Sequence, residues 1–461
     1  MRLFDLPRAA LLAAALLIGP GVAGAADPRV DMLGDGFVAA LPVDWTRTRG
    51  NWEFLDVADC YTNGKSCFGN NPSSPYGYPM FGAAPRFLMG ASEALVVFMR
   101  TPPEVRYFAL TQYLISRGIN VDPVLASLSD SLNTHGFLTL GSPGPGQNLF
   151  NQYAVIVWAA DLNTLASIKT VLSGLGIPGA QVNFLPIPIS LPLNMGYAVN
   201  ADSFSLLLRT AMPVVQADLD KYRADLPFYV VKVGPGSPPP ISPAPTIGYA
   251  SEVSGFAESS DMEAALGSLI ADIKSNYKRS FVVKEQIVVP YLAEGLDCIA
   301  GISTCMLDNH DALYSSDITG TTITVSNVRD LVIVAGVNHH NTGKALYLNQ
   351  TINDPIKSTG IASVDDKSFT TQSALFHGGV KLLGDPRVKL YKDLYAYAIS
   401  YDCNGLKYCL NIPAPTPDKP VGLPPGAPFS LWERSYVEPH TGVRPATTEV
   451  VRQRVLVGAV R

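Results

Sequence analysis

The sequence predicts an α+β protein with mixed, mostly antiparallel sheets that include β-α-β, ferredoxin-like units. Two observations lead to this expectation. Apolar runs with strand character alternate with a few stretches whose apolar residues recur at helical spacing. A set of residues also recurs along the chain, which indicates an internal duplication and a pseudo-twofold arrangement of two related halves.

The recurrence is clearest around two pairs of cysteines. Cys60 and Cys67 have six residues between them, and so have Cys298 and Cys305, at a constant offset of 238 positions (60 to 298). The same offset relates an Asp before each pair and an Asn and a Tyr after it: Asp59, Asn71 and Tyr76 in the first copy, and Asp297, Asn309 and Tyr314 in the second. One shared offset for several residue types favours a duplication over chance.

Later blocks match in the same order, with an offset that drifts by a few residues, as changes in turn length produce. The matched blocks are 95–98 with 331–334, Leu110 and Gln112 with Leu348 and Gln350, 126–127 with 362–363, and Tyr153-Ala154 with Tyr395-Ala396. The order of all the blocks, more than any single one, indicates two related units.

Residues 1–25 have the features of a cleavable export signal. A charged start is followed by the apolar run Ala9–Val22 and by the small residues Ala23-Gly24-Ala25. The run is short for a membrane span and contains Gly19-Pro20-Gly21. No later stretch is apolar over the length that a bilayer requires. We therefore expect an exported protein, periplasmic or extracellular, with no membrane span after signal removal.

All six cysteines fall in three close pairs, which in an exported chain predicts three local disulfides. The expected bonds are Cys60–Cys67, Cys298–Cys305 and Cys403–Cys409. The five or six residues within each pair exceed the usual spacing of a zinc knuckle. We therefore expect neither a metal nor another cofactor.

Composition sets the class of protein. Hydrophobic residues make up 47% of the chain and charged residues 16%, which is typical of a folded protein with a large core. The net charge is only −5 and no basic cluster is present, which argues against nucleic acid as a partner. The repeat divides the chain into a first unit over 26–233, a proline-rich linker over 234–258 and a second unit over 259–461.

The first unit is expected to begin with a short strand over 37–42, followed by strands over 94–99 and 107–115. A clearer β-α-β unit begins at Tyr153: an apolar strand, a helix that Asp161 caps, and a second strand over 181–187. Another strand, helix and strand follow over 203–233. These two units together suggest the ferredoxin-like layer.

The second unit is expected to begin with a helix, because Ser260 and Glu263 form a capping box before an apolar stripe that ends at Tyr277. Strands are expected over 281–289, 321–325, 331–337, 344–351 and 450–457. The third cysteine pair occupies the place where the first unit has its long helix.

Three polar clusters are candidates for chemistry, and the first follows the second cysteine pair. It consists of Asp308, Asn309, His310 and Asp311. A histidine beside carboxylates could act as a general base or as part of a metal donor set. The alternative, which we favour, is a turn whose Asp and Asn side chains bond to their own backbone.

The second cluster follows a strongly apolar strand and consists of Asn338, His339, His340 and Lys344. Residues at the end of a strand are well placed for function, because the sheet holds them rigidly. Adjacent histidines on a strand face opposite sides, so only one of them could enter a shared site. The alternative is a polar hairpin turn.

The third cluster is the counterpart in the first unit: Arg100, Glu104 and Arg106. Two arginines could bind a carboxylate or phosphate group of a ligand. The alternative is a structural Glu–Arg ion pair, which is the more common arrangement on protein surfaces.

Our leading hypothesis is an exported, disulfide-linked pseudo-dimer that binds a small or extended ligand in a cleft between its halves. In this hypothesis the ligand meets Arg100, Glu104, Arg106, Asn309 and Asn338. A secreted hydrolase or lyase that uses His310, Asp311, His339, His340 and Lys344 is one alternative. A structural or interaction protein without a catalytic site is the other. No G-x-S-x-G, H-E-x-x-H or Walker motif is present.

Overall fold

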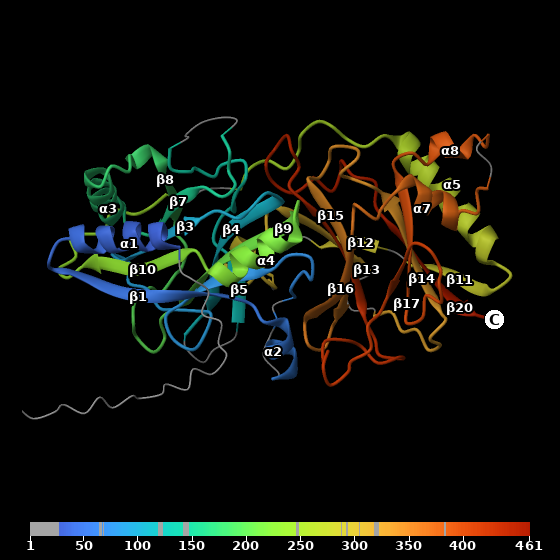
Figure 1. Ribbon diagram of the computed structural model, residues 1–461, viewed down its shortest axis with the longest axis horizontal. Coiled ribbons are helices and arrows are strands. Elements are labelled where there is room, and N and C mark those ends of the chain that lie inside the picture. Colours follow the sequence, from blue (N-terminus) through green and yellow to red (C-terminus); the bar gives the residue numbers. More distant parts are fainter. Residues whose placement is uncertain are drawn as a thin grey trace, which may run out of the picture.

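The computed structural model describes residues 27–63, 67, 69–118, 123–141, 147–245, 249–286, 288–291, 294–303, 305–317, 322–381 and 384–461. The export signal predicted over residues 1–25 lies outside them. Within these ranges, no helix is both long and apolar enough to cross a membrane. The chain forms three mostly antiparallel sheets with helices beside them, and the largest sheet curls into a half-barrel (Figure 1). The predicted α+β class is confirmed.

The first half builds one ten-stranded sheet in the order β5-β4-β9-β2-β1-β10-β3-β7-β8, with β6 also paired to β4. Its elements are α1 (Pro28–Ala40), β1 (Trp45–Phe54), α2 (Val57–Thr62), β2 (Tyr76–Met80), β3 (Ala94–Arg100), β4 (Val105–Ser116), β5 (Pro123–Ser127), β6 (Leu132–Asn133), β7 (Tyr153–Ala159), α3 (Leu162–Gly174), the 3-10 turn η1 (Gly179–Gln181), β8 (Val182–Pro186), β9 (Ser203–Pro213), α4 (Gln216–Asp225) and β10 (Phe228–Pro235).

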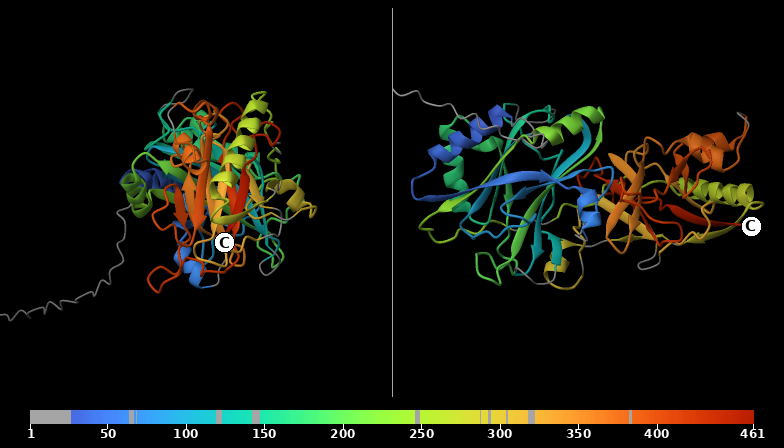
Figure 2. Two further views of the ribbon diagram at one scale, coloured as in Figure 1. Left: turned by 90° about the vertical axis from the view of Figure 1, so that its right-hand side faces the viewer. Right: turned by 60° about the horizontal axis from the view of Figure 1, so that its bottom comes forward.

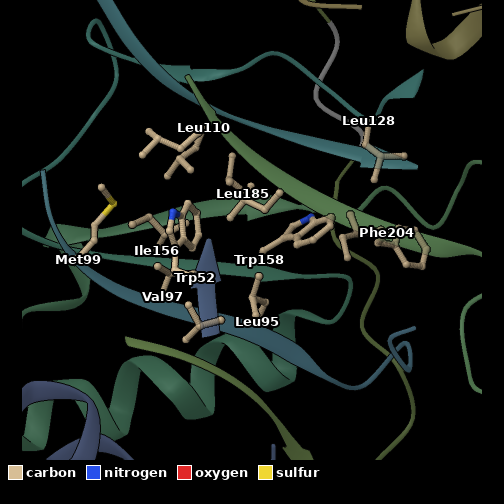
Figure 3. Close-up of a cluster of buried hydrophobic side chains, with 14 of the residues drawn as sticks. Trp52, Leu95, Val97, Met99, Leu110, Leu128, Ile156, Trp158, Leu185 and Phe204 are labelled. Carbon is tan, nitrogen blue, oxygen red and sulfur yellow. The ribbon is translucent and has the colours of Figure 1, made fainter. Parts of the chain in front are cut away.

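The long strand β1 joins the two parts of this sheet. Its residues 45–50 pair with β10, whereas its residues 51–54 pair with β2. The sheet therefore turns at β1, and strands of both parts contribute side chains to one apolar core. Figure 3 shows this core, in which Trp52 of β1, Trp158 of β7 and Phe204 of β9 lie among aliphatic side chains.

The predicted crossover between β7 and β8 is confirmed. The two strands are parallel neighbours, and α3 connects them. Asp161 caps α3 by accepting hydrogen bonds from the N–H groups of Asn163 and Thr164. The elements of the second predicted unit, β9, α4 and β10, are also present, but β2 and β1 lie between β9 and β10 in the sheet. Because each of the three pairings from β9 to β10 is antiparallel, these two strands run in opposite directions. The prediction of a second parallel β-α-β unit is therefore wrong.

The short strand predicted over 37–42 is wrong, because residues up to Ala40 belong to α1. Asp27 caps this helix by accepting the N–H of Arg29, and Pro28 fits its first turn. Val30, Gly34 and Phe37 recur at helical spacing and are buried against the sheet. Two glycines within the helix lower its intrinsic propensity, and this buried face outweighs them.

The second half builds two five-stranded sheets, in the orders β11-β20-β14-β17-β18 and β12-β13-β19-β15-β16. Its elements are α5 (Ser260–Tyr277), β11 (Phe281–Gln286), β12 (Val288–Tyr291), α6 (Gly295–Ile299), β13 (Ala312–Asp317), β14 (Leu331–Val337), β15 (Tyr347–Asp354), β16 (Thr359–Asp365), α7 (Thr371–His377), α8 (Arg387–Leu390), β17 (Leu394–Ser400), β18 (Cys409–Asn411), β19 (Ser430–Tyr436) and β20 (Arg454–Val460). Helices α5 and α7 pack on the first of these sheets.

The three predicted disulfides are confirmed: Cys60–Cys67, Cys298–Cys305 and Cys403–Cys409. The first two each join a cysteine within a short helix, α2 or α6, to one seven residues later. The third spans the connection from β17 to the first residue of β18, and these two strands are parallel neighbours like β7 and β8. This disulfide thus lies in the connection between two parallel strands, as α3 does in the first half.

The two halves lie side by side along the longest axis of the molecule, with sheets meeting between them (Figures 1 and 2). An apolar cluster crosses the junction and contains Tyr107 of β4 and Ala211 of β9 together with Tyr347 of β15 and Tyr436 of β19. The junction thus forms between the faces of the first-half strands β4 and β9 and the second-half strands β15 and β19.

Candidate functional site

The junction between the halves is unusually polar for buried structure. The rings of Tyr107 and Tyr436 lie 4.9 Å apart, and those of Tyr347 and Tyr436 lie 5.2 Å apart. All three side chains are buried. Their hydroxyls meet Asn71, Asn309 and Asp311. Hydrogen bonds of this kind satisfy buried polar groups and fix one relative orientation of the two halves.

A buried arginine from each half supports this junction. Arg209 of β9 is 1% exposed, and its guanidinium donates to the hydroxyls of Thr111 and Tyr113. Its charge also lies over the ring of Tyr76, at 5.1 Å. In the second half, Arg434 of β19 donates to Thr351 and to the carbonyl of Gly69. Neither arginine has a carboxylate partner among the residues that the structure describes.

The predicted cluster after the second cysteine pair lies at the junction. Asp308 accepts the backbone N–H of Ser127 at 2.8 Å and its hydroxyl. Asp311 accepts from the Tyr107 hydroxyl at 2.9 Å and from Asn133 at 2.6 Å. Asn309 accepts the backbone N–H of Asp311, as an Asx turn does. These contacts bind a turn of the second half to strands β4, β5 and β6 of the first.

Burial controls the charge of the two aspartates. Both are fully enclosed, and burial raises the pKa of Asp311 to about 7 despite the hydrogen bonds from Asn133 and Tyr107 that lower it. Burial also raises the pKa of Asp308, against the opposing hydrogen bonds of Ser127. Asp311 therefore changes its charge near neutral pH within the junction.

A loop of the first half, residues 69–74, docks onto the second half. The N–H of Gly69 donates to the carbonyl of Ser358, and the N–H of Gly360 donates to Asn70. A Cβ at Gly360 would lie 2.2 Å from the Asn70 carbonyl, so only glycine allows this approach. The side chain of Asn71 reaches Tyr347, Tyr436 and Asn349.

The second part of the linker, residues 249–258, is bound to the second half by three of the predicted catalytic residues. His310 stacks on Tyr249 with ring centroids 3.4 Å apart. Lys344 donates to Ser254 and to Glu449, and Glu449 accepts the N–H groups of Ser254 and Gly255. His339 contacts Glu258 at 2.8 Å. We call residues 249–258 with these partners the linker clamp.

The linker clamp is strongly ionic and largely buried. Burial lowers the pKa of His339, but Glu258 and Glu433 outweigh it and raise this pKa to about 10. Burial raises the pKa of Glu258, but His339, Thr342 and the N–H of Val451 outweigh it and lower this pKa. His339 and Glu258 are therefore both charged at neutral pH. His310 similarly lies 2.5 Å from Glu294, which pairs with Arg444, and Arg444 reaches Glu252 of the linker.

The structure does not bring the two predicted histidine clusters into one site. His310 meets Glu294, Asp130 and Tyr249, whereas His339 meets Glu258 and Glu433. His340 faces the carbonyl of Ala345 in its own turn. Asn338 donates to the carbonyls of Asp366 and Phe369. Among the described residues, no group of three or more His, Cys, Asp or Glu side chains could hold a metal ion.

The third predicted cluster is also divided. Arg100 pairs with Asp27 at 2.9 Å and with Asp225 at 3.3 Å, whereas Arg106 pairs with Asp366 of the second half. Glu104 is exposed to solvent. Both arginines therefore already have carboxylate partners, and Arg106 holds the halves together.

A groove with a volume of about 670 Å³ lies beside the junction. One wall is the docked loop, including Asn70, Ser73 and Ser74, and the other is α4 from its first residue, Gln216, to Arg223 in its last turn. Phe54, Leu219 and three prolines give it an apolar part. The first half alone lines this groove, but the second half holds the loop that forms one wall.

Two polar groups of the groove have no partner among the described residues. The hydroxyl of Ser74, a residue only 2% exposed, makes no hydrogen bond, and neither does the buried Nε of Arg223. Arg223 makes no ion pair there and lies over the ring of Phe54 at 5.5 Å. Sequence reasoning missed this arginine because it lies in a charged helix, where it resembles an ordinary surface residue.

Sequence reasoning also missed the junction arginines, although a signal was present. Arg209 interrupts an apolar strand after Leu206, Leu207 and Leu208, and such a position indicates a charge held inside the protein. The recurring tyrosines Tyr76 and Tyr314 pair with Arg209 and Arg434 in the sheets.

No protein-family model matches the chain, and no curated protein matches it. Among solved structures, an uncharacterized protein from Burkholderia cenocepacia and the VPA0106 protein from Vibrio parahaemolyticus are similar to it over 93% of its length. Each is 12% identical with a TM-score of 0.37, and the matches cover 87% and 99% of those two chains, respectively. At that TM-score, the likeness supports no argument about fold or function.

Proposed function

We propose that this chain is an exported, duplicated protein whose two halves form a pseudo-dimer, and that it binds an anionic ligand in the groove beside their junction. The strand orders support the duplication. The sheet segment β1-β10-β3-β7-β8 corresponds, strand for strand in chain order, to β11-β20-β14-β17-β18. The segment β1-β2-β9-β4-β5 corresponds in the same way to β12-β13-β19-β15-β16. In both halves the segment of the first correspondence ends in a parallel pair, which is β7-β8 in the first half and β17-β18 in the second.

Strand registers support the duplication at the level of single residues. The sequence blocks relate Val97 to Ile333 at an offset of 236 and Ile156 to Ala398 at an offset of 242. Val97 pairs with Ile156 in the first half, and Ile333 pairs with Ala398 in the second. Two blocks that were aligned separately are thus consistent with the strand pairing.

Reciprocal contacts across the junction support a pseudo-twofold axis, because in an isologous interface each contact occurs twice with the roles exchanged. Gly69 N–H bonds to the Ser358 carbonyl, and Leu307 N–H bonds to the Leu125 carbonyl. Asn70 accepts the N–H of Gly360, and Asp308 accepts the N–H of Ser127. Positions 69 and 307, and 70 and 308, differ by the repeat offset of 238.

In the proposed duplication, the strand registers change two of the residue correspondences that the sequence suggested. Ala109 and Asn349 hold equivalent places opposite Arg209 and Arg434, so β4 and β15 correspond at an offset of 240. The match of Leu110 and Gln112 to Leu348 and Gln350 is therefore displaced by two residues. Ser127 corresponds to Gly360 rather than to Ser363, because each pairs with the equivalent residue of its neighbouring strand.

The groove carries the binding function. Its volume of about 670 Å³ is within the range of small-molecule sites, and its lining is part apolar and part polar as in such sites. A guanidinium without an ion pair favours a carboxylate or phosphate group. The Ser74 hydroxyl belongs to the docked loop, on the opposite wall from Arg223, and offers a second donor. The three disulfides support export, since disulfides persist in oxidising compartments.

Calorimetric titration of the purified full chain with citrate, inorganic phosphate and the peptide acetyl-Glu-Glu tests this function. We expect at least one of these anions to bind the native protein. Replacement Arg223→Gln removes the charge-assisted bonds and should weaken that binding by about tenfold or more. Replacement Gln216→Trp should weaken it by filling the groove.

The control is Ala217→Trp, because Ala217 is exposed on the same helix and does not line the groove. It should bind as the unmodified protein does. The proposal fails if none of the three anions binds, or if Arg223→Gln and Gln216→Trp both leave the affinity unchanged.

A further inference from the structure

In the first half, aromatic rings fill the space where β1 passes from β10 to β2. Trp52 and Phe228 stack with centroids 4.2 Å apart and planes 7° apart. Phe54 and Tyr222 pack edge-on against Phe228, with centroids 6.3 Å and 5.7 Å from it. Trp52 is 4% exposed. We call these four side chains the aromatic plug.

Strand registers identify the counterparts of two plug residues. Trp52 pairs with Pro79, and Val288 pairs with Asp317. The two partners, Pro79 and Asp317, are related by the repeat offset of 238. Phe228 pairs with Met99, and Arg454 pairs with Ala335. The two partners, Met99 and Ala335, are related by the offset of 236 of their sequence block. On the proposed duplication, Val288 therefore replaces Trp52 and Arg454 replaces Phe228.

The second half leaves this space open. Val288 and Arg454 both line a cavity of about 620 Å³, together with Glu263, Glu285, Gln286, Thr447, Val450, Arg452 and Gln453. Tyr222 has no helical counterpart, because residues 437–453 contain no helix. The lining residues place this cavity between β11, the start of β12 and the chain that enters β20.

Two residues that line the cavity have a buried polar atom without a partner among the described residues. Gln453 is 1% exposed, and its Nε2 has no hydrogen-bond partner among the described residues. The Oε1 of Gln286 is also buried and without a partner there. Arg452 makes no ion pair within the described part of the chain, in contrast to Arg454, which pairs with Glu263 and Glu285. A buried donor left unpaired destabilises the folded protein, and a ligand that pairs with it would remove this cost.

We propose that this cavity binds the C-terminal end of a peptide. One peptide bond presents an N–H for the Oε1 of Gln286 and a carbonyl for the Nε2 of Gln453. The terminal carboxylate next to that bond suits the guanidinium of Arg452. The volume is in the range of sites for small ligands. This inference rests on the proposed duplication but not on the groove, which lies in the other half.

The probes are acetyl-Ala-Ala and its C-terminal amide, because they differ only in the terminal charge. Titration calorimetry with the full chain should detect binding of the acid and at least tenfold weaker binding of the amide. Val288→Trp supplies the ring that Trp52 supplies in the first half, so it should abolish binding without lowering the midpoint of thermal unfolding. Arg452→Gln, at an exposed position, should make the two probes bind equally.

Arg279→Gln is the matched control, since Arg279 is exposed and does not line the cavity. It should keep the preference for the acid. Absence of binding by acetyl-Ala-Ala overturns the proposal, and so does a folded Val288→Trp protein that binds as before. If Val288→Trp does not fold, the Arg452→Gln result decides, because loss of the preference supports the site and its retention overturns it. Binding of citrate or phosphate in the groove of the first half is unaffected by either result.

Discussion

Asp311 is a junction side chain whose charge changes near neutral pH. Its pKa is about 7 in the folded protein because it is buried, against about 4 in an unfolded chain. A carboxyl group with a raised folded pKa stabilises the fold below its unfolded pKa, and this contribution is lost as the pH rises to its folded pKa. The side chains and charges around it, namely Asn133, Tyr107, Asp130 and Arg209, come from β6, β4, the loop after β5, and β9.

Replacement Asp311→Asn removes this pH dependence while keeping the shape of the side chain. We expect the free energy of unfolding of the variant to rise relative to the unmodified protein between about pH 4 and about pH 7, by a few kcal/mol at roughly 1.4 kcal/mol per pKa unit. Above about pH 7 the difference should become constant. Urea unfolding at a series of pH values measures it. A difference that is the same at every pH would contradict the assignment of a raised pKa.

His339 also loses its stabilising contribution as the pH rises, but in a higher pH range and because it gains charge partners on folding. Its pKa of about 10 exceeds the unfolded value near 6.5, so its stabilising contribution is complete below about pH 6.5 and is lost as the pH rises towards 10. His339→Gln leaves Glu258 buried without its cation. Since breaking a buried pair costs about 3–5 kcal/mol, we expect a loss of that order at neutral pH and a smaller one near pH 10.

The control for this prediction is His440→Gln. His440 is exposed and stacks on Phe256 of the same linker, with centroids 4.4 Å apart. Because that contact is at the surface, its loss should cost under about 1 kcal/mol. Equal effects of the two replacements in urea unfolding would show that the buried ion pair of His339 contributes nothing particular.

At the scale of elements, the linker clamp makes residues 249–258 an ordered strap rather than a free spacer. Lys344 is central to it, because it neutralises Glu449, which binds two N–H groups of the strap. Lys344→Met leaves that carboxylate buried without a cation. We expect faster hydrogen exchange at Ser254 and Gly255, measured by mass spectrometry, with unchanged exchange in β14.

Lys274→Met serves as the control for the strap. Lys274 is a half-exposed residue of α5 that pairs with Glu285. Its replacement should leave exchange in the strap unchanged, since exposed ion pairs contribute little. Unchanged exchange at Ser254 in the Lys344→Met protein would mean that the strap is held by its other contacts.

Elements with strong local signals could be predicted from the sequence. The strands β3 and β14 have continuous apolar runs, and α3 and α5 have capping residues before an apolar stripe. α1 was missed because its two glycines and short stripe resemble a strand followed by a turn. The neighbours of β9 and β10 could not be predicted, because strand order depends on pairing between residues far apart in the chain.

The residues selected from the sequence hold the linker and do not line the groove of the proposed site. His310 was selected because it follows a cysteine pair beside carboxylates, and His339 and Lys344 because they follow an apolar strand; all three are buried. Their partners Glu294, Glu258 and Glu449 are distant in sequence, and nothing in a local pattern links them. The three basic side chains were therefore candidates for a reaction site in the sequence, whereas in the structure they pair with glutamates and hold the linker.

At the scale of the whole molecule, the duplication that we propose accounts for the polar junction. An interface between two copies buries the same patch on each, so Asn71 and Asn309 each reach tyrosines of the opposite half. The two halves differ away from this patch. The first half has α3 and the aromatic plug, whereas the second has a disulfide loop and a cavity at the positions that correspond in the proposed duplication.

Such a junction should hold the halves together without a covalent link. A protease recognition sequence inserted between Pro239 and Pro240 lies in the exposed segment 236–241, before the linker clamp. After cleavage, we expect the two fragments to elute together from gel filtration with the mass of the intact chain.

Gly360→Ala should lower the urea concentration at which the fragments separate, because a Cβ there would meet the Asn70 carbonyl at 2.2 Å. Gly267→Ala, where a Cβ meets nothing, should not. Two separate fragments in the absence of urea would show that the chain connection, and not a self-complementary junction, holds the halves in place.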